Sequence, residues 1–119
     1  MAKIEELRKY LNGIEDYGSV VSPEYKSFQT KYKNYLKTLA KEHNGELVKF
    51  NPNHYEFSCF IKRNGKYVYI SISDVRYFKN QWYSNILIRT AQNDKDYSGG
   101  RNCYTRLEEL GSMIEDMTE

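Results

Sequence analysis

The chain has 119 residues, of which 39% are hydrophobic and 29% are charged, a composition typical of a folded domain rather than a disordered segment. The net charge of +2 is too small to indicate nucleic-acid binding by itself. No stretch of about 18 apolar residues could span a membrane, and the first residues lack the apolar run of a secretory signal. We therefore expect a cytoplasmic protein with a single domain, 1–119.

Two helices are predicted in the first part of the chain. Apolar residues recur at helical spacing over residues 3–12, which indicates a short amphipathic helix. Ser22-Pro23 is a typical helix start, because serine caps free amides and proline loses no hydrogen bond there, and Asn44-Gly45 is a typical stop. The polar face of this second helix is either solvated or in contact with phosphates. That face carries Lys26, Lys33 and Lys37.

After Gly45 the hydrophobic period changes from that of a helix to that of a strand, which predicts a strand at 46–51. Residues 54–63 and 66–73 flank Asn64-Gly65, the dipeptide most typical of a two-residue hairpin turn. This turn would pair apolar residues on one face of the hairpin. A slip by one residue would turn them outward, so the register is well specified. The expected pairs are Ile61 with Val68, Cys59 with Ile70 and Phe57 with Ile72.

The other face of this hairpin would place Phe60 opposite Tyr69 and Lys62 opposite Tyr67. We expect an aromatic and basic patch there, chemically like the stacking surfaces of single-strand RNA binders but without their aromatic-glycine signature. Cover by the N-terminal helix or by a partner, including a second copy, is the alternative. The 12 tyrosines of the chain fit either reading. The candidate nucleic-acid-binding residues are Lys33, Lys37, Phe60, Lys62, Tyr67 and Tyr69.

A fourth strand is predicted at 81–91, after a connection at 74–80 and before a long polar loop at 92–102. Thr105-Arg106-Leu107-Glu108 has the form of a capping box and predicts a last helix. The expected order α-α-β-β-β-β-α is an α+β fold: an antiparallel β-meander of about four strands with two N-terminal helices and one C-terminal helix. The last helix should present an acidic face with Glu108, Glu109, Glu115 and Asp116.

No residue pattern points to catalysis. His43 and His54 neighbour no cysteine or serine in a known catalytic frame. His43 with Glu46, or His54 with Glu56, could share a metal with other groups, but two such histidines are more often polar surface residues. Gly99-Gly100 lacks the lysine-serine ending of a phosphate-binding loop. Two cysteines, Cys59 and Cys103, have no metal or redox spacing and are expected to be reduced. We therefore expect no enzyme, no cofactor and no metal site.

Polar, charged and aromatic residues crowd the end of the predicted fourth strand and the loops beside it. Binding sites are commonly built on loops held by a rigid sheet, although a solvated loop has the same composition. We take these residues as candidate contacts with a partner protein. They are Asp74, Arg76, Arg89, Asp96, Tyr97 and Arg101.

Three segments, ISISDVR (70–76), WYSNILIRTA (82–91) and KDYSGGRN (95–102), resemble small accessory proteins of Gram-positive (Firmicutes) mobile genetic elements, namely conjugative elements and phages. Some short proteins of such elements are anti-CRISPR proteins. The resemblance implies a stoichiometric inhibitor of an RNA-guided nuclease, which would occlude a basic channel with its acidic face or compete for guide RNA. A nucleic-acid-binding accessory protein of conjugation or transcription is the alternative.

Overall fold

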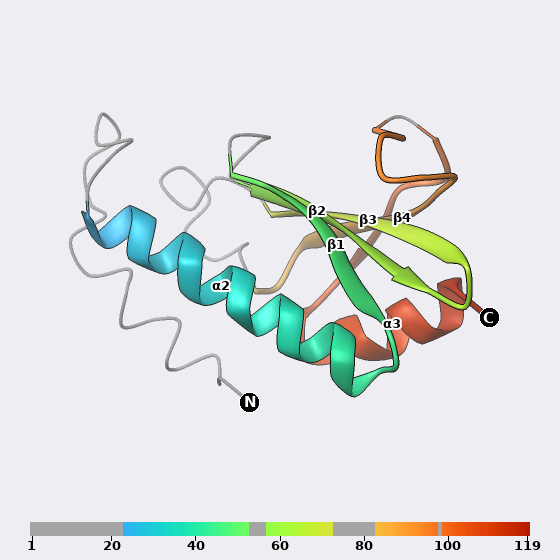
Figure 1. Ribbon diagram of the computed structural model, residues 1–119, viewed down its shortest axis with the longest axis horizontal. Helices are drawn as coiled ribbons and strands as arrows, with labels where there is room; N and C mark the ends of the chain where they lie inside the picture. Colours follow the sequence, from blue (N-terminus) through green and yellow to red (C-terminus); the bar gives the residue numbers. More distant parts are fainter. Residues whose placement is uncertain (1–22, 53–56, 73–82, 98) are drawn as a thin grey trace.

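The computed structural model describes residues 23–52, 57–72, 83–97 and 99–119 (Figure 1). The helix expected at 3–12 and the connection expected at 74–80 lie outside these residues. The elements in chain order are the helix α2 (Pro23–Glu42), the strands β1 (Glu46–Asn51), β2 (Phe57–Arg63), β3 (Lys66–Ile72), β4 (Ile86–Ala91) and β5 (Cys103–Thr105), the 3₁₀ helix η2 (Leu107–Glu109), and the helix α3 (Leu110–Met117).

The protein is α+β, with five strands in one antiparallel meander of order β1-β2-β3-β4-β5. Among the described elements, one α-helix precedes the sheet and one follows it. Both α-helices lie on one face of the sheet, which we call the inner face (Figure 1). The β4–β5 loop (residues 92–97 and 99–102) stands over the opposite, outer face (Figure 1). No helix within the described ranges has both the length and the apolarity needed to cross a membrane.

The central hairpin has the register that its turn predicts. Asn64 and Gly65 both adopt positive φ, 55° and 73°, as a type I′ turn requires. The expected pairing is confirmed, from Arg63 with Lys66 to Phe57 with Ile72. Because side chains alternate along a strand, this register turns the apolar row of β2 and β3 toward the helices.

The core lies between the inner face and the two helices. Tyr32 of α2 packs edge-on against Phe57 of β2, with ring centroids 4.9 Å apart. Both side chains are fully buried, and burial raises the pKa of the Tyr32 phenol. Leu110 and Ile114 of α3 complete the same cluster. Its other buried members include Phe28, Tyr35, Leu36, Leu39, Cys59, Ile61, Val68, Ile70, Ile72, Ile86 and Ile88.

A β-bulge interrupts the edge strand β1. Leu47 pairs with Ile61 and Lys49 pairs with Phe60, so the register shifts by one residue between them. The extra residue lets Leu47 and Phe50 pack against the core while Lys49 lies on the outer face. The bulge therefore places one cation of β1 beside the aromatic residues of β2 and β3.

The C-terminal region differs from its prediction. Residues 103–105 form a fifth strand, whose Thr105 pairs with Ile86. The capping box is wrong, because Thr105 is part of the sheet and the N-cap residue Arg106 makes no side-chain cap bond. The carboxylate of Glu108 accepts a hydrogen bond from Arg106 Nε at 3.0 Å. The first turn of η2 is held from outside, since the Leu107 amide donates to the Tyr83 carbonyl at 2.7 Å.

Candidate functional site

The side chain of Arg89 holds the β4–β5 loop against the outer face of the sheet. It is only 5% exposed, although it lies on the outer face of β4. Its guanidinium donates to the carbonyl oxygens of Asp96 at 3.3 Å, Gly99 at 3.0 Å and Tyr97. Its Cζ atom lies 4.3 Å from the ring centroid of Tyr69. A buried cation is costly unless it is hydrogen-bonded, and here three carbonyl oxygens of the loop backbone accept from the guanidinium. Arg89 therefore fixes the loop on the sheet.

Asp96 shapes the same loop from within. Its carboxylate accepts hydrogen bonds from the Gln92 amide at 2.9 Å and from the Gly99 amide at 2.7 Å. A Cβ atom at Gly99 would overlap this carboxylate, and Gly100 has a positive φ of 75° close to the Thr90 carbonyl. The two glycines thus serve close approach and a turn. Asp96, like Arg89, holds the loop together.

Tyr97 covers the aromatic pair of the outer face. Its ring stands edge-on to Phe60 at 5.2 Å and to Tyr69 at 5.8 Å, measured between centroids. Its hydroxyl donates to Asn51 Oδ1 at 3.2 Å. Phe60 is 0% and Tyr69 is 1% exposed, so the expectation that these rings form an open stacking surface is wrong. The hairpin register was sufficient to pair them, but the cover depends on the distant β4–β5 loop.

Two lysines of the outer face lie against tyrosine rings. Lys49 Nζ is 5.3 Å from the Tyr97 centroid and donates to the Asp94 carbonyl at 3.4 Å. Lys62 is exposed, and its Nζ is 5.6 Å from the Tyr67 centroid. The cation–π attraction between a lysine ammonium group and an aromatic ring is weak at exposed sites such as these. These contacts add lysine charge to the border of the loop.

We give the name loop-side surface to three side chains of this region that have exposed area: Tyr97, Arg101 and Tyr104. Tyr97 is 36% and Tyr104 is 59% exposed, and Arg101 is exposed as well. Tyr104 lies on β5 opposite Leu87. Tyr104 was missed because the sequence predicted a polar loop up to residue 102 and a helix cap at Thr105, so no strand was expected at 103–105. The candidate contacts Asp74 and Arg76 lie outside the described residues.

The exposed side of α2 carries a second charged surface, which we call the lysine row: Lys26, Lys33, Lys37 and Lys41. Lys33 Nζ lies 5.5 Å from the Phe50 centroid. Because α2 covers the inner face, Lys33 and Lys37 lie on the other side of the sheet from Lys62 and Tyr67 (Figure 1). The candidate nucleic-acid-binding residues therefore divide between two surfaces, and their aromatic pair is buried.

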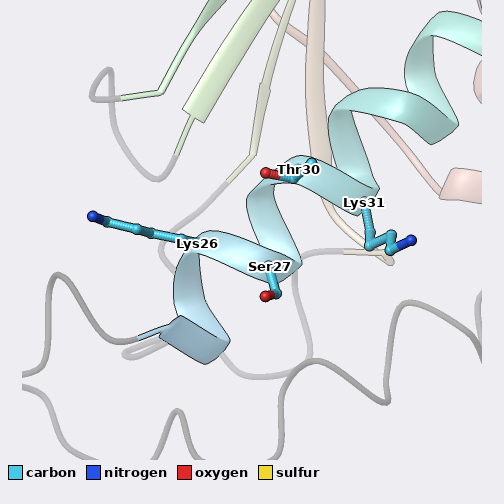
Figure 2. A pocket seen from close by; sticks show the side chains of 4 residues that line it. All are labelled: Lys26, Ser27, Thr30 and Lys31. Atoms are coloured by element: carbon cyan, nitrogen blue, oxygen red, sulfur yellow. The ribbon is translucent and has the colours of Figure 1, made fainter.

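A hollow of about 230 Å³ lies beside the first turns of α2. Lys26, Ser27, Thr30 and Lys31 line it, and the ammonium groups of the two lysines point in opposite directions (Figure 2). The lysines therefore do not converge on a single small anion.

His43 connects the end of α2 to α3. Its Nδ1 bonds to the carboxylate of Glu115, and its ring lies against Gly111. The hydrogen bond from His43 holds the pKa of Glu115 below its usual range. Arg63 Nε donates to the His43 carbonyl at 2.7 Å. Through its contacts with the Glu115 carboxylate and with Gly111, His43 joins the end of α2 to α3.

The two cysteines of the chain have free thiols, one on β2 and one on β5. Burial raises the pKa of the Cys59 thiol to about 12, which makes it a poor nucleophile. Cys103 is half-buried on β5. In the part of the chain that the structure describes, no three histidine, cysteine, aspartate or glutamate side chains come together as metal ligands would. Of the four acids expected on one face, Glu108, Glu109 and Asp116 are exposed, whereas Glu115 is half-buried and bonds to His43.

No protein-family model, no curated protein and no solved structure matches this chain. The resemblance to accessory proteins of mobile elements therefore has no support from an identified relative. What the protein binds has to be inferred from the loop-side surface, the lysine row and their chemistry.

Proposed function

We propose that this protein acts by stoichiometric binding to a partner protein and contacts it with the loop-side surface. The observation that carries the proposal is the Arg89 guanidinium, which is bound to three carbonyl oxygens of the β4–β5 loop. A loop held in this way loses little conformational freedom on binding, so more of its contact energy appears as affinity. Tyrosine and arginine are also the residue types that most often anchor interfaces.

The division of labour within the loop follows from burial. Arg89 and Asp96 use their polar groups inside the loop, so they position it. Arg101 and Tyr104 are exposed and contact the partner directly. Tyr97 has both roles, because one side of its ring packs on Phe60 and its remaining surface is exposed.

The partner proposed is an RNA-guided nuclease, so that the protein is an anti-CRISPR inhibitor. This partner class comes from the resemblance of residues 70–102 to accessory proteins of mobile elements. An inhibitor of this kind requires no catalytic group, since occupancy of the nuclease is sufficient to block it. It would act at one copy per nuclease complex.

The test is inhibition of purified nuclease–guide complexes from CRISPR-bearing Gram-positive hosts. Target DNA cleavage is measured while the protein is titrated, and the end point gives the stoichiometry. We expect Arg101→Ala and Tyr104→Ala each to weaken inhibition at least about tenfold, as truncation of an interface anchor does. Ser112→Ala, an exposed change on α3, is the matched control and should inhibit like the natural sequence.

Unchanged inhibition by both loop variants would refute the loop-side surface as the contact. Absence of inhibition across the nuclease panel, with a folded protein, would refute the proposed partner. Continued inhibition far below one copy per complex would indicate turnover and would contradict stoichiometric binding.

A further inference from the structure

The lysine row sets like charges against one another along α2. Lys33, Lys37 and Lys41 follow at intervals of four residues, which places them next to one another on the helix surface. Like charges at this spacing destabilise a helix. α2 contains five lysines but only two glutamates, Glu24 and Glu42. α2 therefore contains a repulsion between neighbouring lysines that a change of Lys37 to an acidic residue would relieve.

The positive charge of the lysine row is also not neutralised by ion pairs with other described residues. Among the described residues, Lys26, Lys37 and Lys41 make no ion pair; the pairs found there are His43 with Glu115 and Arg106 with Glu108. An anion that approaches the exposed side of α2 therefore meets cations without displacing a carboxylate.

We propose that the lysine row of α2 binds the phosphate backbone of a nucleic acid. From Lys26 to Lys41 the row extends about 22 Å at the usual helical rise of ~1.5 Å per residue. One strand of a duplex presents a phosphate about every 3.4 Å along its axis, so a row of this length can follow several phosphates. Lysine ammonium groups are point charges on flexible stems, suited to phosphate contacts.

The side chains between the lysines fit the same ligand. Thr30 and Asn34 are exposed on this side of α2 and can donate hydrogen bonds to phosphate oxygens. The hollow beside Thr30 opens next to the row and separates the ammonium groups of Lys26 and Lys31 (Figure 2). Divergent lysines suit an extended polyanion better than a single small anion. Binding of this kind depends on the backbone and is independent of base sequence.

This inference goes beyond the proposed function and does not depend on it, since the two surfaces lie on opposite sides of the sheet. The probes are a fluorescent single-stranded RNA, an RNA duplex and a DNA duplex of arbitrary sequence, measured by anisotropy between about 50 and 200 mM NaCl. We expect the affinity to fall with salt, with a log–log slope of about −0.9 for each duplex phosphate that is neutralised.

The double variant Lys33→Gln/Lys37→Gln tests whether the lysine row binds the nucleic acid. It should weaken binding at least about tenfold and reduce the slope by about 2, since two phosphate contacts are lost. Its thermal midpoint should stay the same or rise, because the like-charge repulsion is relieved. Lys62→Gln/Lys95→Gln, which removes the same charge from two exposed lysines outside α2, should bind nearly as well as the natural sequence. Arg101→Ala should also bind normally.

An equal loss in the Lys62/Lys95 control would attribute binding to bulk charge and overturn the proposal. So would affinity that does not change with salt, or absence of binding to all three probes at the lowest salt. Binding to poly-glutamate but to none of the nucleic acids would overturn it in favour of an acidic protein partner. Preference among the three probes would identify the kind of strand that the row follows.

Discussion

The imidazole ring of His43 occupies the space in which a side chain at Gly111 would lie. A Cβ atom at Gly111 would overlap Nε2 and both neighbouring ring carbons of His43. The glycine therefore lets the end of α2 approach the first turn of α3 closely, and Glu115, one turn further on, bonds to Nδ1 of the same ring. This contact links the C-terminal end of α2 to the first turn of α3.

Gly111→Ala should destabilise the protein, although alanine is normally preferred to glycine within a helix by about 1 kcal/mol. Overlap with His43 should reverse the sign and cost about 1–3 kcal/mol of unfolding free energy. Urea unfolding measures it, with Ser112→Ala, the exposed next residue, as the control expected to change little. The double variant His43→Ala/Gly111→Ala should recover part of the loss, and a stabilised Gly111→Ala protein would contradict the contact.

Arg89→Lys should loosen the β4–β5 loop almost as much as Arg89→Ala. One ammonium group cannot reproduce the forked contacts of the guanidinium with the carbonyls of Asp96, Tyr97 and Gly99. We expect a loss of about 2–3 kcal/mol in stability, the size of hydrogen bonds made by a charged group. Faster amide hydrogen exchange at Gly99 should accompany it. Arg101→Ala, by contrast, should stay within about 0.5 kcal/mol.

The contact between His43 and Glu115 predicts a pH dependence. The pKa of Glu115 is lowered first by the hydrogen bond from His43 and then by the charges of His43 and Arg63. A carboxyl with a lowered pKa in the folded state stabilises the fold above its ordinary pKa, and this contribution is lost as the pH falls through the lowered value. Glu115→Gln should therefore reduce the thermal midpoint near neutral pH and approach the natural protein in acid.

The control for this pH profile is Asp116→Asn, an exposed acid on the same helix. It should run parallel to the natural protein across the titration. A difference between Glu115→Gln and the natural protein that persisted unchanged into strong acid would show that the carboxylate charge is not the cause.

The two thiols should differ in reactivity. Cys59 is fully buried with a pKa raised to about 12, whereas Cys103 is half-buried on the edge strand β5. A thiol reagent at mildly alkaline pH should label Cys103 readily in the folded protein and Cys59 only after unfolding. Cys103→Ser should leave the folded protein almost unlabelled. Rapid labelling of that variant would mean that the inner face of β2 opens readily.

The parts of the fold that local sequence determines were predictable. The Asn64-Gly65 turn was sufficient for the pairing of β2 with β3, because turn geometry fixes the register of a hairpin. The Ser22-Pro23 start and the Asn44-Gly45 stop likewise predicted the helix α2 (Pro23–Glu42). β5 was missed, since three residues are too few to show alternation. The capping box was wrong because the backbone of Thr105 pairs with β4, a partner that its neighbours in sequence do not reveal.

The candidate site was predictable in composition but not in arrangement. Arg89 near the end of β4, and Asp96 and Tyr97 in the loop after it, were taken as candidate contacts from the sequence. Which of them face inward depends on the long-range packing of Tyr97 on Phe60 and Tyr69, and no local pattern encodes it. The same packing turned an expected open aromatic patch into a covered one. The contact role of these residues remains a prediction.

The bulge in β1 also bears on how copies of this protein meet. β1 is an outermost strand of the described sheet, and without the bulge its outer margin would carry a regular ladder of amides and carbonyls that could pair with a strand of another molecule. The inserted residue breaks that ladder and increases the local twist, while Lys49 adds a charge. A flat strand from a neighbour would find no matching register there. One additional residue thus protects the sheet against growth by intermolecular strand addition.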